Sequence, residues 1–380
     1  MKFVRNFSRI ITALVFIFSG FVKAVDPMGT AYKFGDYFLA MNLEFLMDWA
    51  VPLAFLLIAA EFIIGWMLLF NVWTRVTSWF ALGFMLLFTP VTLWLAVTNK
   101  VDDCGCFGDF LVMTNWETFV KNVVILVIVL ILFFTRKKFS NPTKRWKQVI
   151  YTLAGILCVA YIQFYAYNHL AILDFRPFYK GAHIADNMLP VPEIAEITLV
   201  YKHRLTGEEM SFSPKTLPYQ DSTLWPHLEW TRQEKKIIQP FQEAEAAFEI
   251  MGPEGKDHSP DIIGNKDFIF VLIMQDVSKA NRKSFKKIVP LIEEANRRNI
   301  QVIAITGSMY DEVEAFLGEM GAPIPHYSAD IIKLKTVIRA NPGLLLLKNG
   351  YIIDKWHFND IPDLKKLRVE SAFDAFAPVQ

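Results

Sequence analysis

Two cysteines separated by one glycine are the residues whose types and spacing are best suited to chemistry. Cys104 and Cys106 lie in the segment DDCGCFGD, residues 102–109. Thiols at this spacing can close a small, strained disulfide ring, and Gly105 supplies the backbone freedom that such a tight loop demands. Strained and exposed disulfides are the ones that exchange readily. The pair therefore favours thiol–disulfide redox chemistry.

Two other interpretations of the pair stay open. The cysteines can form a permanent disulfide that holds the loop in place, or they can bind a soft metal ion. Two thiolates alone fall short of a closed zinc site, and no histidine follows at ligand spacing, so we expect no metal.

The charges around the two thiols act in opposite directions. The neighbouring Asp102, Asp103 and Asp109 raise thiol pKa values by like charge. Lys100 or Lys121 and the start of the next helix lower them, so the direction of electron transfer is also open.

The composition places much of the chain in lipid. Hydrophobic residues make up 53% of the 380 residues, and there are 33 Phe and 10 Trp. That share suits a membrane protein with an additional domain. The net charge of +1 and the lack of a basic patch with interleaved aromatic residues exclude nucleic acid as a partner. With three cysteines, a disulfide framework is excluded as well.

Five apolar runs predict five membrane-spanning helices. Each run is close to the roughly 20 residues that cross a bilayer. The runs are residues 8–25, 51–71, 76–98, 118–135 and 149–171. The lipid bilayer is therefore expected to surround the first part of the chain.

The lysines and arginines predict the orientation of these helices. Basic residues precede the first run and fill the connection between the fourth and fifth, residues 136–147. Because cytoplasmic loops carry the excess of Lys and Arg, we expect a cytoplasmic N-terminus. The cysteine loop and everything after the fifth helix then lie on the oxidising side of the membrane, outside the cytoplasm. Alternatively, the first run is a signal peptide cleaved after residues 22–24, which leaves the rest of the topology unchanged.

Polar side chains within the spans are candidates for function, because charges at membrane depth are costly. Glu61 lies near the middle of the second run and is a candidate proton or quinone contact. The alternative is a structural ion pair, for instance with Lys23. Lys121 and Asn122 lie at the start of the fourth run, and together with Lys23 they are candidate binding residues. A quinone is therefore a candidate cofactor.

Two strings resemble a known family of membrane proteins. Residues 18–27, FSGFVKAVDP, resemble the opening signature of DoxX-like proteins. CGCFGD (residues 104–109), with Lys121-Asn122 beginning the next span, is similar to the MauE branch of that superfamily. The resemblance covers residues 1–135 and implies a four-helix bundle in a bacterial inner membrane. The basic loop and fifth helix, residues 136–172, lie outside the family pattern, and we expect them to act as a tether.

The resemblance also implies redox chemistry of two kinds. MauE proteins are associated with disulfide formation during the maturation of a periplasmic enzyme subunit. DoxX relatives are linked to quinone-dependent sulfur oxidation. Nothing else in this sequence identifies methylamine metabolism, so we do not expect that substrate.

An α/β domain is expected after the membrane part. Residues 173–239 are predicted to be a linker with a β-hairpin at 196–213, and residues 240–380 a domain of alternating strands and helices. The strands are predicted at 246–250, 267–274, 300–305, 343–347 and 351–356, and the helices at 278–297 and 311–320.

The order of these elements resembles the thioredoxin fold, in particular its TlpA-like and peroxiredoxin-like members. Pro342 stands where that family has its cis-proline. A thioredoxin has Cys-x-x-Cys after its first central strand, but residues 275–281 read QDVSKAN here, and the soluble half contains no cysteine. The domain therefore cannot itself carry out thiol exchange. We expect a binding module in which Pro342 shapes a groove for an extended peptide.

Three functions fit these features. The first is a membrane thiol–disulfide protein in which Cys104 and Cys106 exchange disulfides with a periplasmic client or redox partner. Because the chain has no second cysteine pair, a partner must supply the next electron-transfer step. The second is a non-enzymatic scaffold or assembly factor with a permanent disulfide. The third is a quinone-binding or transport subunit that depends on Glu61.

Overall fold

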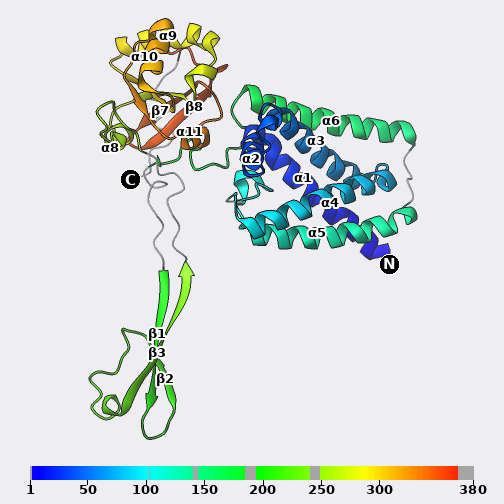
Figure 1. The fold of residues 1–380 in the computed structure, drawn as a ribbon, viewed down its shortest axis with the longest axis vertical. Helices are drawn as coiled ribbons and strands as arrows, with labels where there is room; N and C mark the ends of the chain where they lie inside the picture. The colour runs from blue at the N-terminus through cyan, green and yellow to red at the C-terminus, as the bar shows by residue number, and fades with distance from the viewer. Residues whose placement is uncertain (1, 102, 140–143, 185–193, 240–248, 367–380) are drawn as a thin grey trace.

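The computed structural model describes residues 2–101, 103–139, 144–184, 194–239 and 249–366. Apolar helices form one unit, and a C-terminal α/β unit lies against one end of it (Figure 1). A three-stranded sheet stands apart from both, and the N-terminus lies at the end of the helical unit farther from the α/β unit.

Five helices of the first unit are long and apolar enough to cross a membrane, so the five predicted apolar runs are confirmed as long helices. They are α1 (Lys2–Val25), α3 (Ala50–Leu69, preceded by the 3-10 turn η1, Glu44–Trp49), α4 (Thr74–Thr98), α5 (Asn115–Thr135, followed by η3, Arg136–Lys138) and α6 (Arg145–Asn168). Thr114 and Glu117 form a capping box that fixes the start of α5.

Helices α1 and α3 approach each other closely enough for backbone contact. A Cβ atom added at Gly65 would lie 2.6 Å from the backbone nitrogen of Ile17. Glycine at this position therefore sets the distance between the two helices. One consequence is that the buried side chains of Lys23 on α1 and Glu61 on α3 face each other.

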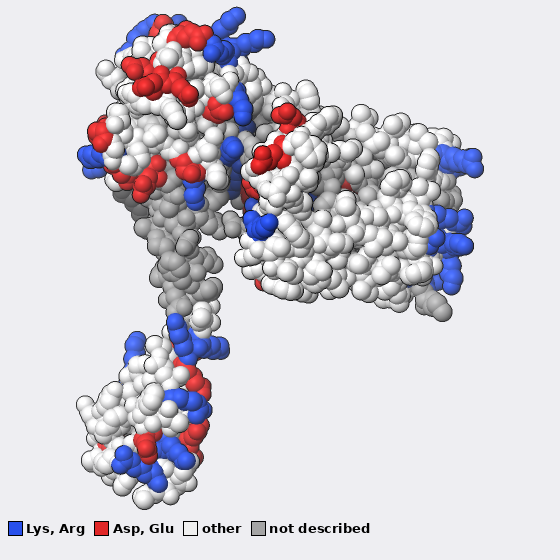
Figure 2. Space-filling view, in the orientation of Figure 1, with Lys and Arg blue, Asp and Glu red and all other residues white. Residues whose placement is uncertain are grey.

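The surface of the helical unit follows the charge pattern of the sequence. Figure 2 shows mostly uncharged side chains along the helices and Lys and Arg side chains at the end away from the α/β unit. The connection between α5 and α6 contributes to this basic end.

A further helix, α2 (Pro27–Ala40), was not predicted. It begins directly after α1, where the Asp26 carboxylate accepts a hydrogen bond from Gly29 N at 3.0 Å and Pro27 occupies the first turn. Aspartate at the N-cap followed by proline is a favourable helix start. Figure 1 places α2 at the end of the helical unit that faces the α/β unit.

The α/β unit contains a five-stranded sheet in the order β6-β5-β4-β7-β8. The strands are β4 (Ile269–Met274), β5 (Gln301–Thr306), β6 (His326–Ser328), β7 (Gly343–Lys348) and β8 (Tyr351–His357). β4 runs parallel to β5 and antiparallel to β7, which pairs antiparallel with β8. All six residues of β4 are buried, as the predicted central strand requires, because hydrophobic cores cover both faces of the sheet.

Short helices and turns connect these strands. They are α8 (Ser259–Ile263), η5 (Val277–Lys279), η6 (Arg282–Ser284), α9 (Phe285–Arg297), α10 (Tyr310–Glu319) and α11 (Ile331–Val337). The prediction of one helix over 278–297 was wrong at its start. Asp276 caps the first turn and Asn281 the second, so two separate 3-10 turns precede α9.

Part of the predicted 246–250 strand lies outside the described residues. Nearby, Met251 forms isolated bridges with Asp257 and Ser328. The bond between Asn341 and Pro342 is cis.

The separate sheet has the order β2-β1-β3. Strands β1 (Ile194–His203) and β2 (Glu209–Phe212) form the predicted antiparallel hairpin. Strand β3 (Leu228–Gln239), preceded by η4 (Trp225–His227), pairs antiparallel with β1 and was not predicted.

Candidate redox site and the adjoining cleft

The two loop cysteines lie side by side in the segment between α4 and α5. Cys104 and Cys106 are free, partly exposed, and have their sulfur atoms 2.8 Å apart. Gly105 between them has φ +64°, in the left-handed region that disfavours side chains, and a Cβ there would lie 3.2 Å from Lys33 Cγ. Little movement is needed to join the two sulfur atoms.

Helix α2 holds this loop from one side. The Tyr37 hydroxyl donates a 2.6 Å hydrogen bond to the carbonyl oxygen of Cys104. Lys33, one helical turn earlier, forms an ion pair of 2.6 Å with Asp103. Asp103 also accepts a hydrogen bond of 2.7 Å from the backbone nitrogen of Gly105. The helix that the sequence did not predict thus supplies two of the loop's anchors.

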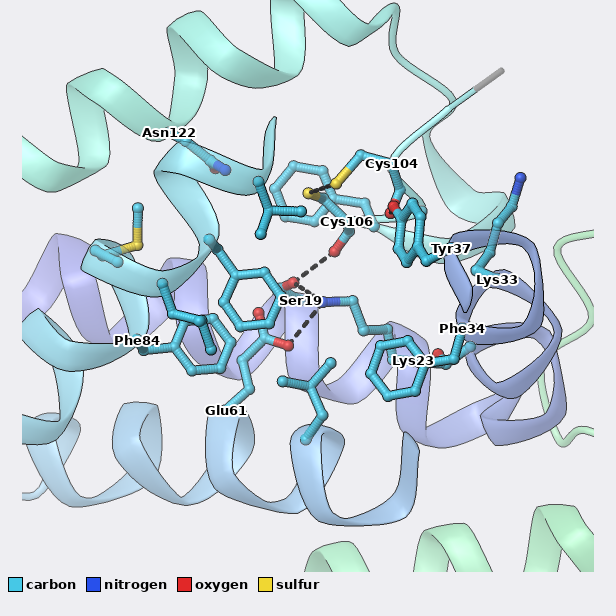
Figure 3. A pocket seen from close by; sticks show the side chains of 18 of the residues that line it. Ser19, Lys23, Lys33, Phe34, Tyr37, Glu61, Phe84, Cys104, Cys106 and Asn122 are labelled. Atoms are coloured by element: carbon cyan, nitrogen blue, oxygen red, sulfur yellow. Dashed lines mark hydrogen bonds and ion pairs between the residues drawn. The ribbon is translucent and has the colours of Figure 1, made fainter. Parts of the chain in front are cut away.

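Helices α1 and α3 support the loop from within the bundle. The Ser19 hydroxyl donates to the carbonyl oxygen of Cys106 at 2.6 Å. Lys23 donates to Ser19 Oγ at 3.1 Å and forms an ion pair of 2.7 Å with Glu61. Lys23 is 7% exposed and Glu61 5% exposed. Figure 3 shows this chain of contacts running from Glu61 toward the cysteines.

The two thiols are electrostatically unequal. The hydrogen bond from Cys104 and the nearby charges of Lys121 and Lys23 outweigh burial and lower the pKa of Cys106 to about 6. The same hydrogen bond, together with burial, raises the pKa of Cys104. The pair therefore loses its first proton easily and its second with difficulty. A thiolate is the nucleophile in disulfide exchange.

An apolar chamber of about 230 Å³ adjoins the cysteines. Cys104, Cys106, Lys23, Glu61, Lys121 and Asn122 all line it. Asn122 is buried and donates to Thr92 Oγ1 at 3.2 Å. Lys121 lies with its ammonium 4.3 Å from the centre of the Phe107 ring. The structure thus brings six of the seven predicted site residues to one chamber.

A larger cleft of about 940 Å³ lies between the loop region and the α/β unit. Asp103, Gly105 and Asp109 line it on one side, and Gln275 and Asn341 on the other. Pro342, the seventh predicted residue, is buried and is not among the lining residues, although Ala340 and Asn341 beside it are. The expectation that Pro342 shapes a peptide groove therefore stays a prediction, because its own side chain does not line this cleft.

Arg339 also lines this cleft. Its guanidinium pairs with Asp26 at 2.9 Å and with Asp109 at 3.2 Å. Although burial works to raise it, Arg339 and Arg176 hold the pKa of Asp26 below its usual value.

Two further hydrogen bonds join the α/β unit to the helical unit. Tyr32 on α2 donates to Gln275 Oε1 at 3.3 Å. At the end of α6, the Asn168 carbonyl accepts a hydrogen bond of 2.8 Å from Asn359.

Sequence patterns alone did not single out Lys33, Tyr37 or Ser19 as residues of this site. The Asp26-Pro27 helix start was the available signal, because a helix beginning there places Lys33 and Tyr37 on one face, four residues apart. Among the charged residues expected to shift the thiol pKa values, Lys121 lowers the pKa of Cys106 as expected. Asp102 lies outside the described residues. Among the described residues, no three His, Cys, Asp or Glu side chains gather as a metal site.

Comparison with known proteins gives one family. Residues 1–135 match the family model for the methylamine utilisation protein MauE. No curated protein and no solved structure matches the chain. The MauE-like region contains α1 to α5, the cysteine loop and the chamber. The family match and the five apolar helices together identify a membrane protein, and they point to a redox or methylamine-utilisation related system.

Proposed function

We propose that this chain is a thiol–disulfide redox protein of the bacterial inner membrane, assisting the maturation of periplasmic client proteins. Cys104 and Cys106 are its redox pair. The carrying observation is that two free thiols lie 2.8 Å apart, with the pKa of Cys106 lowered to about 6, beside a cleft under the α/β unit.

In the oxidised state the pair acts on a client dithiol. A client thiolate attacks one sulfur of the Cys104–Cys106 disulfide, and the other sulfur leaves as a thiolate. The second client thiolate then attacks the mixed disulfide, which forms the client disulfide and leaves both loop cysteines reduced. The client loses two electrons and the loop gains them. The lowered pKa of Cys106 makes it the better leaving group.

The α/β unit is the proposed client-binding module, with a thioredoxin-like fold. The sheet order β5-β4-β7-β8, with one parallel and two antiparallel pairings and helices α9 and α10 between the strands, supports this fold. Without cysteine it takes no part in exchange. Its Gln275 and Asn341 line the same cleft as Gly105, so a bound extended segment is brought to the redox loop.

The proposed orientation of the protein in the membrane rests on the positions of its Lys and Arg side chains. The lysines and arginines at the end away from the α/β unit support a cytoplasmic N-terminus. The cysteine loop and the α/β unit then lie in the periplasm. Helices α1, α3, α4 and α5 form the proposed four-helix bundle. Helix α6 packs beside α3, where Trp66 Nε1 donates to the Tyr151 carbonyl at 2.9 Å, and acts as the tether.

The redox state of the pair in intact cells tests this function. Thiols are trapped with an alkylating mass tag in a Cys158→Ser background, along a graded series of reductant. We expect a mixture of reduced and oxidised forms that shifts at mild potential. In a variant that lacks Cys106, we expect a mixed disulfide between Cys104 and a client to accumulate. A pair that stays oxidised until strong reductant and denaturant are combined would contradict the proposal.

A scaffold is the second candidate, favoured by one observation. Tyr37, Lys33 and Ser19 anchor the loop at three points, as a permanent structural loop would also be held. The resistant disulfide described above is the outcome expected for such a scaffold.

A further inference from the structure

The chamber beside the cysteines reaches the lipid-facing surface of the bundle. Leu57 of α3 and Leu87 of α4 both line it. Leu87 lies near the middle of α4 and is 62% exposed, so the chamber opens there at membrane depth. Phe84 and Phe88 of α4 form apolar walls behind this opening. A molecule that uses this opening must arrive through the hydrocarbon of the bilayer.

The inner end of the chamber is polar and touches the redox pair. Lys23, Glu61 and Cys106 meet there (Figure 3). An ammonium group has three N–H donors. Within the described residues Ser19 and Glu61 accept two of them, which leaves one donor for an oxygen atom of a ligand.

The size of the chamber selects a small ring. A cavity of about 150 Å³ holds one benzene molecule. The chamber of about 230 Å³ therefore has room for a single substituted ring, while a long apolar tail would extend through the opening beside Leu87 into lipid.

We propose that this chamber binds the head group of a lipid-soluble quinone, which enters between α3 and α4 and reoxidises the cysteine pair. This inference rests on the proposed redox function and names its electron acceptor. Two S–H bonds break and one S–S bond forms, while the two electrons and two protons pass to the two carbonyl oxygens of the quinone, giving a hydroquinone. Lys23 donates a hydrogen bond to one of these oxygens. Clients and quinone then approach the cysteines from different sides.

The test blocks the opening. Full-length protein with Cys158→Ser is reconstituted in lipid nanodiscs, reduced, and mixed with decylubiquinone, and the loss of free thiols and the formation of quinol are followed. Leu87→Trp fills the opening. Leu86→Trp is the matched control, because Leu86 is 56% exposed on the same helix but does not line the chamber. Oxidised glutathione, a water-soluble disulfide, serves as the second oxidant for every variant.

We expect Leu87→Trp to slow oxidation by decylubiquinone roughly tenfold or more, equivalent to about 1.4 kcal/mol on the barrier. Leu86→Trp should behave as the parent, and oxidised glutathione should react equally with all three proteins. If glutathione oxidises the pair but decylubiquinone does not, or if both tryptophan variants react with decylubiquinone at the same rate, the quinone chamber is wrong and the exchange function stands. If neither oxidant reacts with the pair, the redox function itself fails.

Discussion

Arg339 of the α/β unit and Asp26 at the end of α1 are 313 residues apart in sequence, yet their side chains form an ion pair of 2.9 Å. Arg339 also reaches Asp109, just beyond the cysteine loop. One guanidinium therefore joins the α/β unit to the end of the first helix and to the cysteine loop. Because the pair is largely buried, its loss leaves an uncompensated carboxylate at the junction.

Arg339→Ala should loosen the α/β unit from the membrane part. Breaking a buried ion pair from one side costs about 3–5 kcal/mol, and here that cost falls on the docking of the two units. Hydrogen–deuterium exchange of the full-length protein should show faster uptake in residues 27–40 and 103–110. Arg282→Ala is the control, because its ion pair with Glu319 is exposed. Unchanged uptake in both variants would contradict the docking role of Arg339.

The Lys23–Glu61 pair should behave as one unit in a double-mutant cycle. Lys23→Met and Glu61→Gln each leave one buried group without its partner, and each should destabilise the bundle by about 3–5 kcal/mol. The double variant should recover much of that loss, since neither charge remains. Thermal unfolding in detergent measures all four proteins, with Lys100→Met as an exposed control. Additive losses would mean that the two side chains do not depend on each other.

The reactivity of the cysteine loop should depend on pH in a defined direction. Below about pH 6 both thiols are protonated and alkylation by iodoacetamide is slow, whereas above it Cys106 is a thiolate and the rate reaches a plateau. Cys104→Ala removes the hydrogen-bond donor that contributes most to the lowered pKa, so the midpoint should rise toward the ordinary value of about 8.5. Lys121→Gln should move it in the same direction by less. The rate of alkylation against pH, measured in a Cys158→Ser background, tests both shifts, and a midpoint near pH 8.5 in the parent would refute them.

Gly65→Ala should destabilise the bundle, because the new Cβ would lie 2.6 Å from the backbone of α1. Overpacking of this kind costs about 1–3 kcal/mol. Gly83→Ala on α4 is a matched control, since its Cβ would meet no atom within 4 Å. Alanine should be neutral or mildly stabilising there, as a better helix former than glycine. Equal melting temperatures for the two variants would argue against close packing of α1 on α3.

Sequence alone predicted the features that depend on local pattern. Long apolar runs predicted the long helices, and the apolar run within residues 267–274 predicted β4 as a buried strand. It did not predict α2, whose mixed polar and aromatic residues lack a clear period, although Asp26-Pro27 marked its start. It also left the Lys23–Glu61 pair as one of two alternatives, because only the packing of α1 on α3 brings these residues together. The ion pairs of Arg339 depend on the docking of two units, and a local sequence pattern cannot predict contacts between residues so far apart in the chain.

The attachment of the α/β unit at both Arg339 and the end of α6 has a kinetic consequence for the proposed exchange reaction. A client held on that unit meets the cysteine loop as part of the same molecule, at an effective concentration on the order of millimolar for a short connection. Exchange then becomes first order in the bound complex and saturates when the binding module is full. Under the proposed function, the unit without cysteine would set the selectivity among clients, so clients with equally reactive thiols would be distinguished by how tightly they bind to that unit.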